Sequence, residues 1–172
     1  MSKYIRPICI IPARGGSKRI KNKNIRKFNR KPIISYTIRA ANKTKIFSKI
    51  LVSSESNKVK NIVNRYLNVI FLKRPFNLAT DKIPTRPVIK QALIEYSKKF
   101  GLPKYICYMT STAPFIRADD IKKAYNLLVK NNKINFVVSV TKFSYPILRS
   151  LKISKSGKIS FWKKKYIFSR SQ

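Results

Sequence analysis

Short apolar runs alternate with helix-like patterns along most of this chain, and this alternation restricts the possible folds more than any other feature. Residues 7–13, PICIIPA, form a continuous apolar run of the length that a buried strand needs. Similar runs predict further strands at 49–54, 68–75, 105–109 and 134–143. Between them, apolar residues at helical spacing predict helices at 31–44, 55–66, 84–101 and 117–132. This order is typical of an α/β fold, in which a mostly parallel sheet carries helices on both faces.

The last part of the chain has a different pattern. Residues 151–162, LKISKSGKISFW, are typical of a hairpin that turns at Ser156 and Gly157. No internal repeat, low-complexity linker or domain boundary is visible in the sequence. A length of 172 residues suits one domain with a core of its own, so we expect a single domain over residues 1–172.

The chain carries 40 Lys and Arg residues against 5 acidic residues, which gives a net charge of +35. This charge is compatible with nucleic-acid binding, and also with the compositional drift of an A/T-rich genome, which the many Ile and Asn residues suggest. The lysines are spread along the whole length, and the aromatic residues lie in core-like segments, not in a basic strip that could stack bases. The pattern favours drift over a polynucleotide partner, and a phosphate-rich small substrate fits either origin.

The compartment is inferred from the N-terminus and the cysteines. Arg6 and Pro7 interrupt the first apolar region, which is not typical of a signal peptide, and no apolar run approaches the length that spans a bilayer. Cys9 and Cys107 are the only cysteines, and both lie in strand-like runs. We therefore expect a cytoplasmic protein with two buried free thiols; a disulfide or redox pair is the less favoured alternative.

The first apolar run ends in a positively charged loop, ARGGSKR, at residues 13–19. Two adjacent glycines allow backbone N–H groups to converge on an anion, and Arg14 and Lys18 add charged donors. The spacing matches neither the Walker pattern nor the dinucleotide-binding fingerprint. Ligands of parallel sheets bind at the carboxyl ends of the strands, so we predict a phosphate site here. A solvated basic turn is the alternative.

The segment IIPARGGSKRIKNKNIRKFNRKPIISYTI, residues 10–38, closely resembles the N-terminal signature of the acylneuraminate cytidylyltransferase family, which includes the CMP-sialic acid synthetases. FLKRPFNLATDKIPT at 71–85 and YICYMTSTAPFIRADDI at 105–121 are similar to later segments of that family. KFSYPILRSLKISKSGKI at 142–159 resembles its pseudaminic acid branch most closely. The resemblance implies a Rossmann-like nucleotide-diphospho-sugar transferase fold.

The resemblance also implies a reaction, namely transfer of CMP from CTP to a pseudaminic or sialic-type nonulosonic acid, with release of pyrophosphate, for surface glycan biosynthesis. It implies Mg²⁺ as the cofactor. The triphosphate must be held, its charge neutralised and the two substrates aligned, so Arg14 and Lys18 are expected to act in catalysis. A cytidylyltransferase for the eight-carbon acid of lipopolysaccharide cores is an alternative within the same class.

Residues of three segments match the family's nucleotide-binding positions or adjoin them. The nucleotide contacts expected from loop chemistry and from the resemblance are Arg14, Gly15, Gly16, Ser17, Lys18, Lys23, Asn24, Asp81, Thr85, Thr110 and Thr112. Thr85 matches a position near the cytosine and ribose. Asp81 is equally well explained as a turn residue, and Thr110 and Thr112 are also common turn formers.

Other polar residues have simpler explanations or face the second substrate. We expect Glu55 in the first turn of one helix, and Asp119 and Asp120 at the N-cap and first turn of another, without a role in the chemistry. On the sugar side the resemblance implies Arg170 and Gln172, followed by Lys142 and Arg149, because basic side chains suit a carboxylate substrate.

The chain also departs from the family. In relatives the RSQ of residues 170–172 is followed by Asp-Leu and a His-Asp-Ala-Gly segment with the metal-binding chemistry, whereas this chain has no His and no carboxylate after Asp120. The metal ligands are therefore unknown, with Asp81 the remaining candidate. We expect an incomplete, C-terminally truncated domain. The alternatives are a remnant that only binds nucleotide and a basic, non-catalytic nucleic-acid-binding protein.

Two further expectations concern assembly and strain. The full-length family is expected to form homodimers, which is doubtful for this chain. Arg30 stands where relatives usually have Gly, and it is strained if the turn there needs a positive φ.

Overall fold

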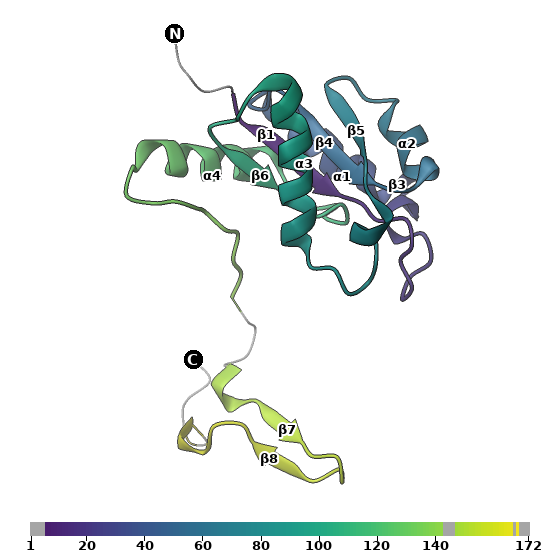
Figure 1. Ribbon diagram of the computed structural model, residues 1–172. Helices are drawn as coiled ribbons and strands as arrows, with labels where there is room; N and C mark the ends of the chain where they lie inside the picture. Colours follow the sequence, from purple (N-terminus) through teal and green to yellow (C-terminus); the bar gives the residue numbers. More distant parts are fainter. Residues whose placement is uncertain (1–5, 143–146, 167, 169–172) are drawn as a thin grey trace. The chain divides into compact units, whose positions relative to one another are not determined.

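A computed structural model describes residues 6–142, 147–166 and 168 of the chain (Figure 1). The chain divides into two compact units, Met1–Asn135 and Phe136–Gln172. Our expectation of a single domain over 1–172 stays a prediction. Within the described ranges, no helix has both the length and the apolar character needed to cross a bilayer.

The first unit is built on a four-stranded parallel sheet with the order β5-β4-β1-β6. The strands are β1 (Ile8–Pro12), β4 (Ile50–Ser54), β5 (Val69–Lys73) and β6 (Ile106–Tyr108). They confirm the first four predicted strands and the parallel α/β architecture. The chain passes from β1 to β4 and β5 on one side and then crosses to β6 on the other side of β1.

Four helices connect and cover these strands, and they confirm the predicted helices with shifted ends. They are α1 (Ile33–Thr44), α2 (Asn57–Val63), α3 (Thr85–Phe100) and α4 (Ala118–Lys130). Asp119 and Asp120 lie in the first turn of α4, where carboxylates suit the positive end of the helix dipole, as expected; the expected N-cap was wrong, because α4 begins at Ala118 and Arg117 is its N-cap.

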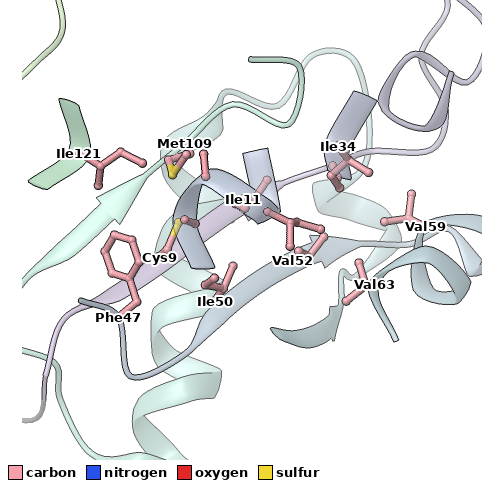
Figure 2. Close-up of a cluster of buried hydrophobic side chains, with 14 residues drawn as sticks. Cys9, Ile11, Ile34, Phe47, Ile50, Val52, Val59, Val63, Met109 and Ile121 are labelled. Carbon is pink, nitrogen blue, oxygen red and sulfur yellow. The ribbon is translucent and has the colours of Figure 1, made fainter. Parts of the chain in front are cut away.

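The two faces of the central strand pack against different helices, because side chains alternate along a strand. Cys9 and Ile11 point to a face covered by α1, α2 and α4; Figure 2 shows them in one apolar cluster with Ile34, Val59 and Ile121. The opposite face is covered by α3, which crosses in front of the sheet in Figure 1. There Ile8, Ile10 and Leu51 contact Ala92 and Tyr96. The sheet therefore lies between two apolar layers.

The cysteines lie side by side on neighbouring strands, since Cys9 of β1 is the register partner of Cys107 of β6. Both thiols are free, and Cys9 is fully buried, as expected, whereas Cys107 is only partly buried. Burial raises the pKa of the Cys9 thiol well above its ordinary value, so this side chain is a neutral core residue.

The predicted strand at 134–143 was wrong for the residues that the structure describes, because 134–142 form neither a strand nor a helix. The side chains of Phe136, Val138 and Val140 are mostly exposed. A strand needs a neighbouring strand to receive its backbone hydrogen bonds, and the apolar run alone does not supply one.

The second unit contains the hairpin predicted for 151–162, formed by β7 (Leu151–Ile153) and β8 (Ile159–Phe161). Gly157 adopts a φ of 78° in the turn, a conformation that glycine reaches without a Cβ clash. Short 3-10 turns at Ile147–Arg149 and Lys164–Tyr166 flank the hairpin.

The structure contains a second hairpin, with strands of two residues each, that the sequence did not predict. It joins β2 (Lys27–Phe28) to β3 (Lys31–Pro32), and Asn29 and Arg30 form its turn with φ values of 41° and 65°. Arg30 therefore does occupy the left-handed region in which a Cβ is strained. The Tyr36 hydroxyl lies 2.9 Å from the Phe28 carbonyl oxygen, to which it donates, and so ties the hairpin to α1.

Candidate functional site

The positively charged loop begins where β1 ends, at the carboxyl edge of the sheet. Ala13 still donates its N–H to the Ser53 carbonyl at 2.9 Å, after which the chain leaves the sheet and turns through residues 14–22 to a 3-10 helix at Lys23–Ile25. The strand order reverses at β1, because the chain continues to β4 on one side and β6 lies on the other. In open parallel sheets this reversal is where ligands bind.

Asn24 connects the loop after β1 with the loop after β6. Its side-chain amide donates to the Arg14 carbonyl at 2.6 Å, and its Oδ1 accepts a hydrogen bond from the Ser111 hydroxyl at 2.8 Å. Both Asn24 and Ser111 are buried, with 6% of each residue exposed. The loop is therefore held by a buried polar pair, and the predicted residues Thr110 and Thr112 flank Ser111 in sequence.

Two cations of the loop share one carboxylate. Asp81 contacts the Arg14 guanidinium through Oδ1, and its Oδ2 lies 3.1 Å from the Lys18 ammonium. The hydrogen bond from Arg14, followed by that from Lys18, lowers the pKa of Asp81 below its ordinary value. Three of the predicted residues therefore meet, although Asp81 is 67 positions from Arg14 in sequence.

The glycine N–H groups also hold a carboxylate. Gly15 donates its backbone N–H to Glu55 Oε1 at 2.7 Å, and Gly16 donates to the same oxygen at 3.3 Å. A Cβ on Gly15 would lie 2.6 Å from the Ser56 Cβ, which leaves no room for a side chain, whereas a Cβ on Gly16 would meet nothing within 4 Å. Glu55 precedes α2 (Asn57–Val63), so its expected place in the first turn of that helix was wrong.

Arg74 is a further cation near this loop, and we had not predicted it. Only 4% of the residue is exposed, and the guanidinium donates to the Ser53 hydroxyl at 3.1 Å and to the Ser53 carbonyl at 2.7 Å. Burial lowers the pKa of Arg74, while the nearby charge of Glu55 opposes this shift and that of Arg14 adds to it. The signal in the sequence was an Arg directly after the strand 69–73, at the same edge as the loop.

The remaining predicted residues make none of the contacts described above at the loop. Ser17 is partly buried, Lys23 is exposed in the 3-10 helix, and Thr85 is the exposed first residue of α3. Lys142 is exposed and belongs to the second unit. The side chain of Arg149 and the predicted sugar-side residues Arg170 and Gln172 lie outside what the structure describes.

The described residues do not form a protein metal site. Among them there is no group of three or more His, Cys, Asp or Glu side chains that could hold a metal ion. The two carboxylates at the loop are already engaged, Asp81 by two cations and Glu55 by two backbone N–H groups. Mg²⁺ would find at most these two carboxylates here, so the other oxygen ligands it requires would have to come from a phosphate substrate or from water.

The arrangement has the chemistry of a polyanion site. Charged donors from Arg14 and Lys18, together with the two glycine N–H groups, gather at the carboxyl edge of the sheet, and each already holds a carboxylate oxygen. These are donor types that bind phosphate groups in proteins.

Comparison with known proteins gives one consistent result. A family profile described as "Cytidylyltransferase" matches residues 8–152. The pseudaminic acid cytidylyltransferase of Campylobacter jejuni is 33% identical over 165 residues, which cover 96% of this chain and 71% of the relative. The N-acylneuraminate cytidylyltransferase of Escherichia coli is 38% identical over 148 residues, which cover 84% of this chain and 34% of the relative.

Solved structures show the same fold. The structure of CMP:2-keto-3-deoxy-manno-octonic acid synthetase complexed with CTP has a TM-score of 0.57 at 20% identity, and covers 74% of this chain. A cytidylyltransferase from Leptospira borgpetersenii has a TM-score of 0.59 at 20% identity, and covers 75% of this chain. This chain spans 48% and 51% of those two chains, respectively.

Proposed function

Because the chain belongs to the cytidylyltransferase family, we propose that it transfers CMP from CTP to a nonulosonic acid of the pseudaminic or sialic type and releases pyrophosphate. The names of the relatives support both the nucleotide and the acid class. We further propose that the reaction takes place in the cytoplasm and serves surface glycan biosynthesis. The homodimer expected for the full-length family stays a prediction for this chain.

The observation that carries this proposal is the set of anion donors on the loop after β1. In the proposed complex the triphosphate takes the donors that Asp81 and Glu55 now hold, namely the Arg14 guanidinium, the Lys18 ammonium and the N–H groups of Gly15 and Gly16. Asn24 would keep the loop in place through its buried hydrogen bonds to Arg14 and Ser111.

The proposed reaction is an in-line displacement at the α-phosphorus of CTP. The anomeric hydroxyl oxygen of the acid forms a bond to this phosphorus and its proton passes to solvent. The bond to the bridging oxygen of the β-phosphate breaks, and pyrophosphate leaves with that electron pair. Arg14 and Lys18 would neutralise the charge that develops on the phosphate oxygens, and such electrostatic stabilisation, together with positioning, is the main contribution of proteins to phosphoryl transfer. Thr85, Thr110 and Thr112 are proposed contacts of the nucleoside, and Arg170 and Gln172 of the acid.

The metal is proposed to come with the substrate. Since Asp81 and Glu55 are engaged by protein donors, and the described residues form no metal-ligand group of their own, we propose that Mg²⁺ is carried to the loop by the triphosphate and not held in a resident site.

Isothermal titration calorimetry with CTP, UTP and ATP in the presence of Mg²⁺ tests the nucleotide. We expect CTP to bind most tightly, Arg14→Ala to weaken it, and Arg39→Ala to leave it unchanged. Arg39 is a matched control because it is an exposed arginine on α1, outside the loop. Equal binding of the three nucleotides would refute the proposal.

Pyrophosphate release then identifies the second substrate. The assay compares pseudaminic acid, N-acetylneuraminic acid and 3-deoxy-manno-octulosonic acid as acceptors with Mg²⁺-CTP. Turnover with a nonulosonic acid supports the proposal, whereas turnover with the eight-carbon acid alone would reassign the enzyme. CTP binding without turnover on any of the three would make the chain a nucleotide-binding protein only.

A further inference from the structure

Carboxylates are scarce in this chain, and their positions are unusual. The sequence contains only 5 Asp and Glu residues against 40 Lys and Arg. Two of the five, Glu55 and Asp81, contact the loop that follows β1. The other three lie on helices α3 and α4, where Glu95 pairs with Lys98 and Asp120 with Arg117. The loop therefore holds a large share of the few acidic groups that the chain possesses.

The two loop carboxylates divide the anion donors between them. Asp81 takes the two side-chain cations, Arg14 and Lys18. Glu55 takes the two backbone donors, the N–H groups of Gly15 and Gly16. Each of the four donors assigned to the triphosphate, two cations and two N–H groups, is therefore in contact with a carboxylate oxygen. A carboxylate oxygen resembles a phosphate oxygen in charge and in its preference for such donors, so the two groups stand where phosphate oxygens would bind.

Neither carboxylate is held as firmly as a permanent structural ligand would be. The Asp81 side chain is 39% exposed, and its partner Lys18 is 84% exposed, so water competes for this ion pair. Glu55 uses one oxygen for both N–H groups, and its buried Oε2 has no hydrogen-bond partner within the described ranges. A buried acceptor without a partner costs free energy, which favours release of Glu55 when a better anion arrives.

We propose that Glu55 and Asp81 are internal competitors for the polyphosphate site: in the unliganded protein they occupy its donors, and a ligand binds only by displacing them. The inference rests on the proposed function for the identity of that ligand as CTP. It makes both residues determinants of specificity. An anion with one phosphate that displaces a carboxylate gains few new contacts and binds weakly. A triphosphate contacts both sets of donors at once and therefore binds more tightly.

Removal of the negative charge at either position should therefore tighten binding, which a merely structural role would not do. Asp81→Asn and Glu55→Gln each keep an oxygen acceptor of similar shape while they lose the charge. A structural role predicts weaker or unchanged binding. A role as metal ligand predicts weaker binding with Mg²⁺ present and no change without it.

The experiment is isothermal titration of inorganic tripolyphosphate and of CTP, in EDTA at low salt, into the full chain and its variants. Asp81→Asn should bind tripolyphosphate about two- to fivefold more tightly than the original chain, the range expected for loss of one partly exposed ion-pair competitor, and Glu55→Gln should also bind it more tightly. Asp120→Asn and Glu95→Gln are the matched controls, because they change the net charge equally but lie on helices away from the loop. The controls should bind as the original chain does.

The outcomes separate this inference from the proposed function. Binding by Asp81→Asn that is no tighter than by Asp120→Asn overturns the inference, and so does absence of tripolyphosphate binding by every variant. Tighter tripolyphosphate binding by the loop variants without any preference for CTP supports the inference and overturns the proposed nucleotide. If Glu55→Gln fails to fold because the buried Arg74 loses its neighbouring charge, the exposed Asp81→Asn decides the question.

Discussion

Replacement of Arg30 by glycine should stabilise the protein, which is unusual for a large-to-small change. Arg30 lies in the β2–β3 turn with a φ of 65°, where its Cβ is strained. Relief of this strain is worth about 1–2 kcal/mol, and the greater freedom of glycine in the unfolded chain costs about 0.5–1 kcal/mol. The difference is a gain of about 0.75 kcal/mol in the free energy of unfolding at mid-range values, with extremes of about 0 and 1.5 kcal/mol. For a unit of this size it raises the melting temperature by about 2–5 °C.

The hairpin is coupled to the rest of the unit, so the gain should appear in global unfolding. The Ile33 N–H donates to the Arg26 carbonyl at 2.9 Å, and the Phe28 ring packs edge-on against Tyr36 and Phe115 at centroid distances of 5.6 and 5.7 Å. Thermal unfolding followed by circular dichroism is therefore a suitable assay.

Two controls isolate the backbone effect from the loss of a positive charge. Arg30→Ala removes the same charge but keeps the Cβ, so the melting temperature should not rise. Arg26→Gly removes an exposed arginine beside the same hairpin at a φ of −59°, where no strain is relieved, and should destabilise by about 0.5–1 kcal/mol. Equal melting temperatures for Arg30→Gly and Arg30→Ala would refute the reasoning.

Two more predictions concern the loop. Gly15→Ala should abolish CTP binding, because the new Cβ would meet the Ser56 Cβ at 2.6 Å and move the loop. The control is Gly16→Ala, whose new Cβ meets nothing within 4 Å and which should bind CTP normally. Equal binding of CTP by the two variants in calorimetry would contradict this prediction. In carboxyl ¹³C NMR the Asp81 carboxyl group should titrate with a pKa below the usual range, because Arg14 and Lys18 stabilise its charged form. The small stability that this contact adds is thus complete above the ordinary pKa of an aspartate and is lost as the pH falls through the lowered value. Arg14→Ala should return the pKa of Asp81 toward the usual range, and a midpoint that does not move would disprove the assigned cause.

Much of the fold could be predicted from local pattern. Each of the four sheet strands lies in a continuous apolar run, and each of the four helices has apolar residues at helical spacing. These elements formed where the patterns predicted them. The segment 134–142 carries an equally apolar pattern and forms no strand. Its failure has a physical reason, since apolar residues favour a strand only when a neighbouring strand and a covering layer are in reach.

One part of the candidate site could be predicted from the sequence and another part could not. The charge and glycine content of residues 14–18 already indicated an anion site, because those properties belong to the residues themselves. Arg74 was missed, since an arginine after a strand is common and only its burial beside Ser53 distinguishes it.

The sequence by itself determined where the strands and helices form and that the first loop is built from anion donors. Only the tertiary structure decided which carboxylates those donors contact. Glu55 lies 40 positions from Gly15, and Asp81 lies 67 positions from Arg14, so no local pattern relates them. Parallel strands bring them together, because their carboxyl ends meet at one edge of the sheet and the loops that follow them must share that edge.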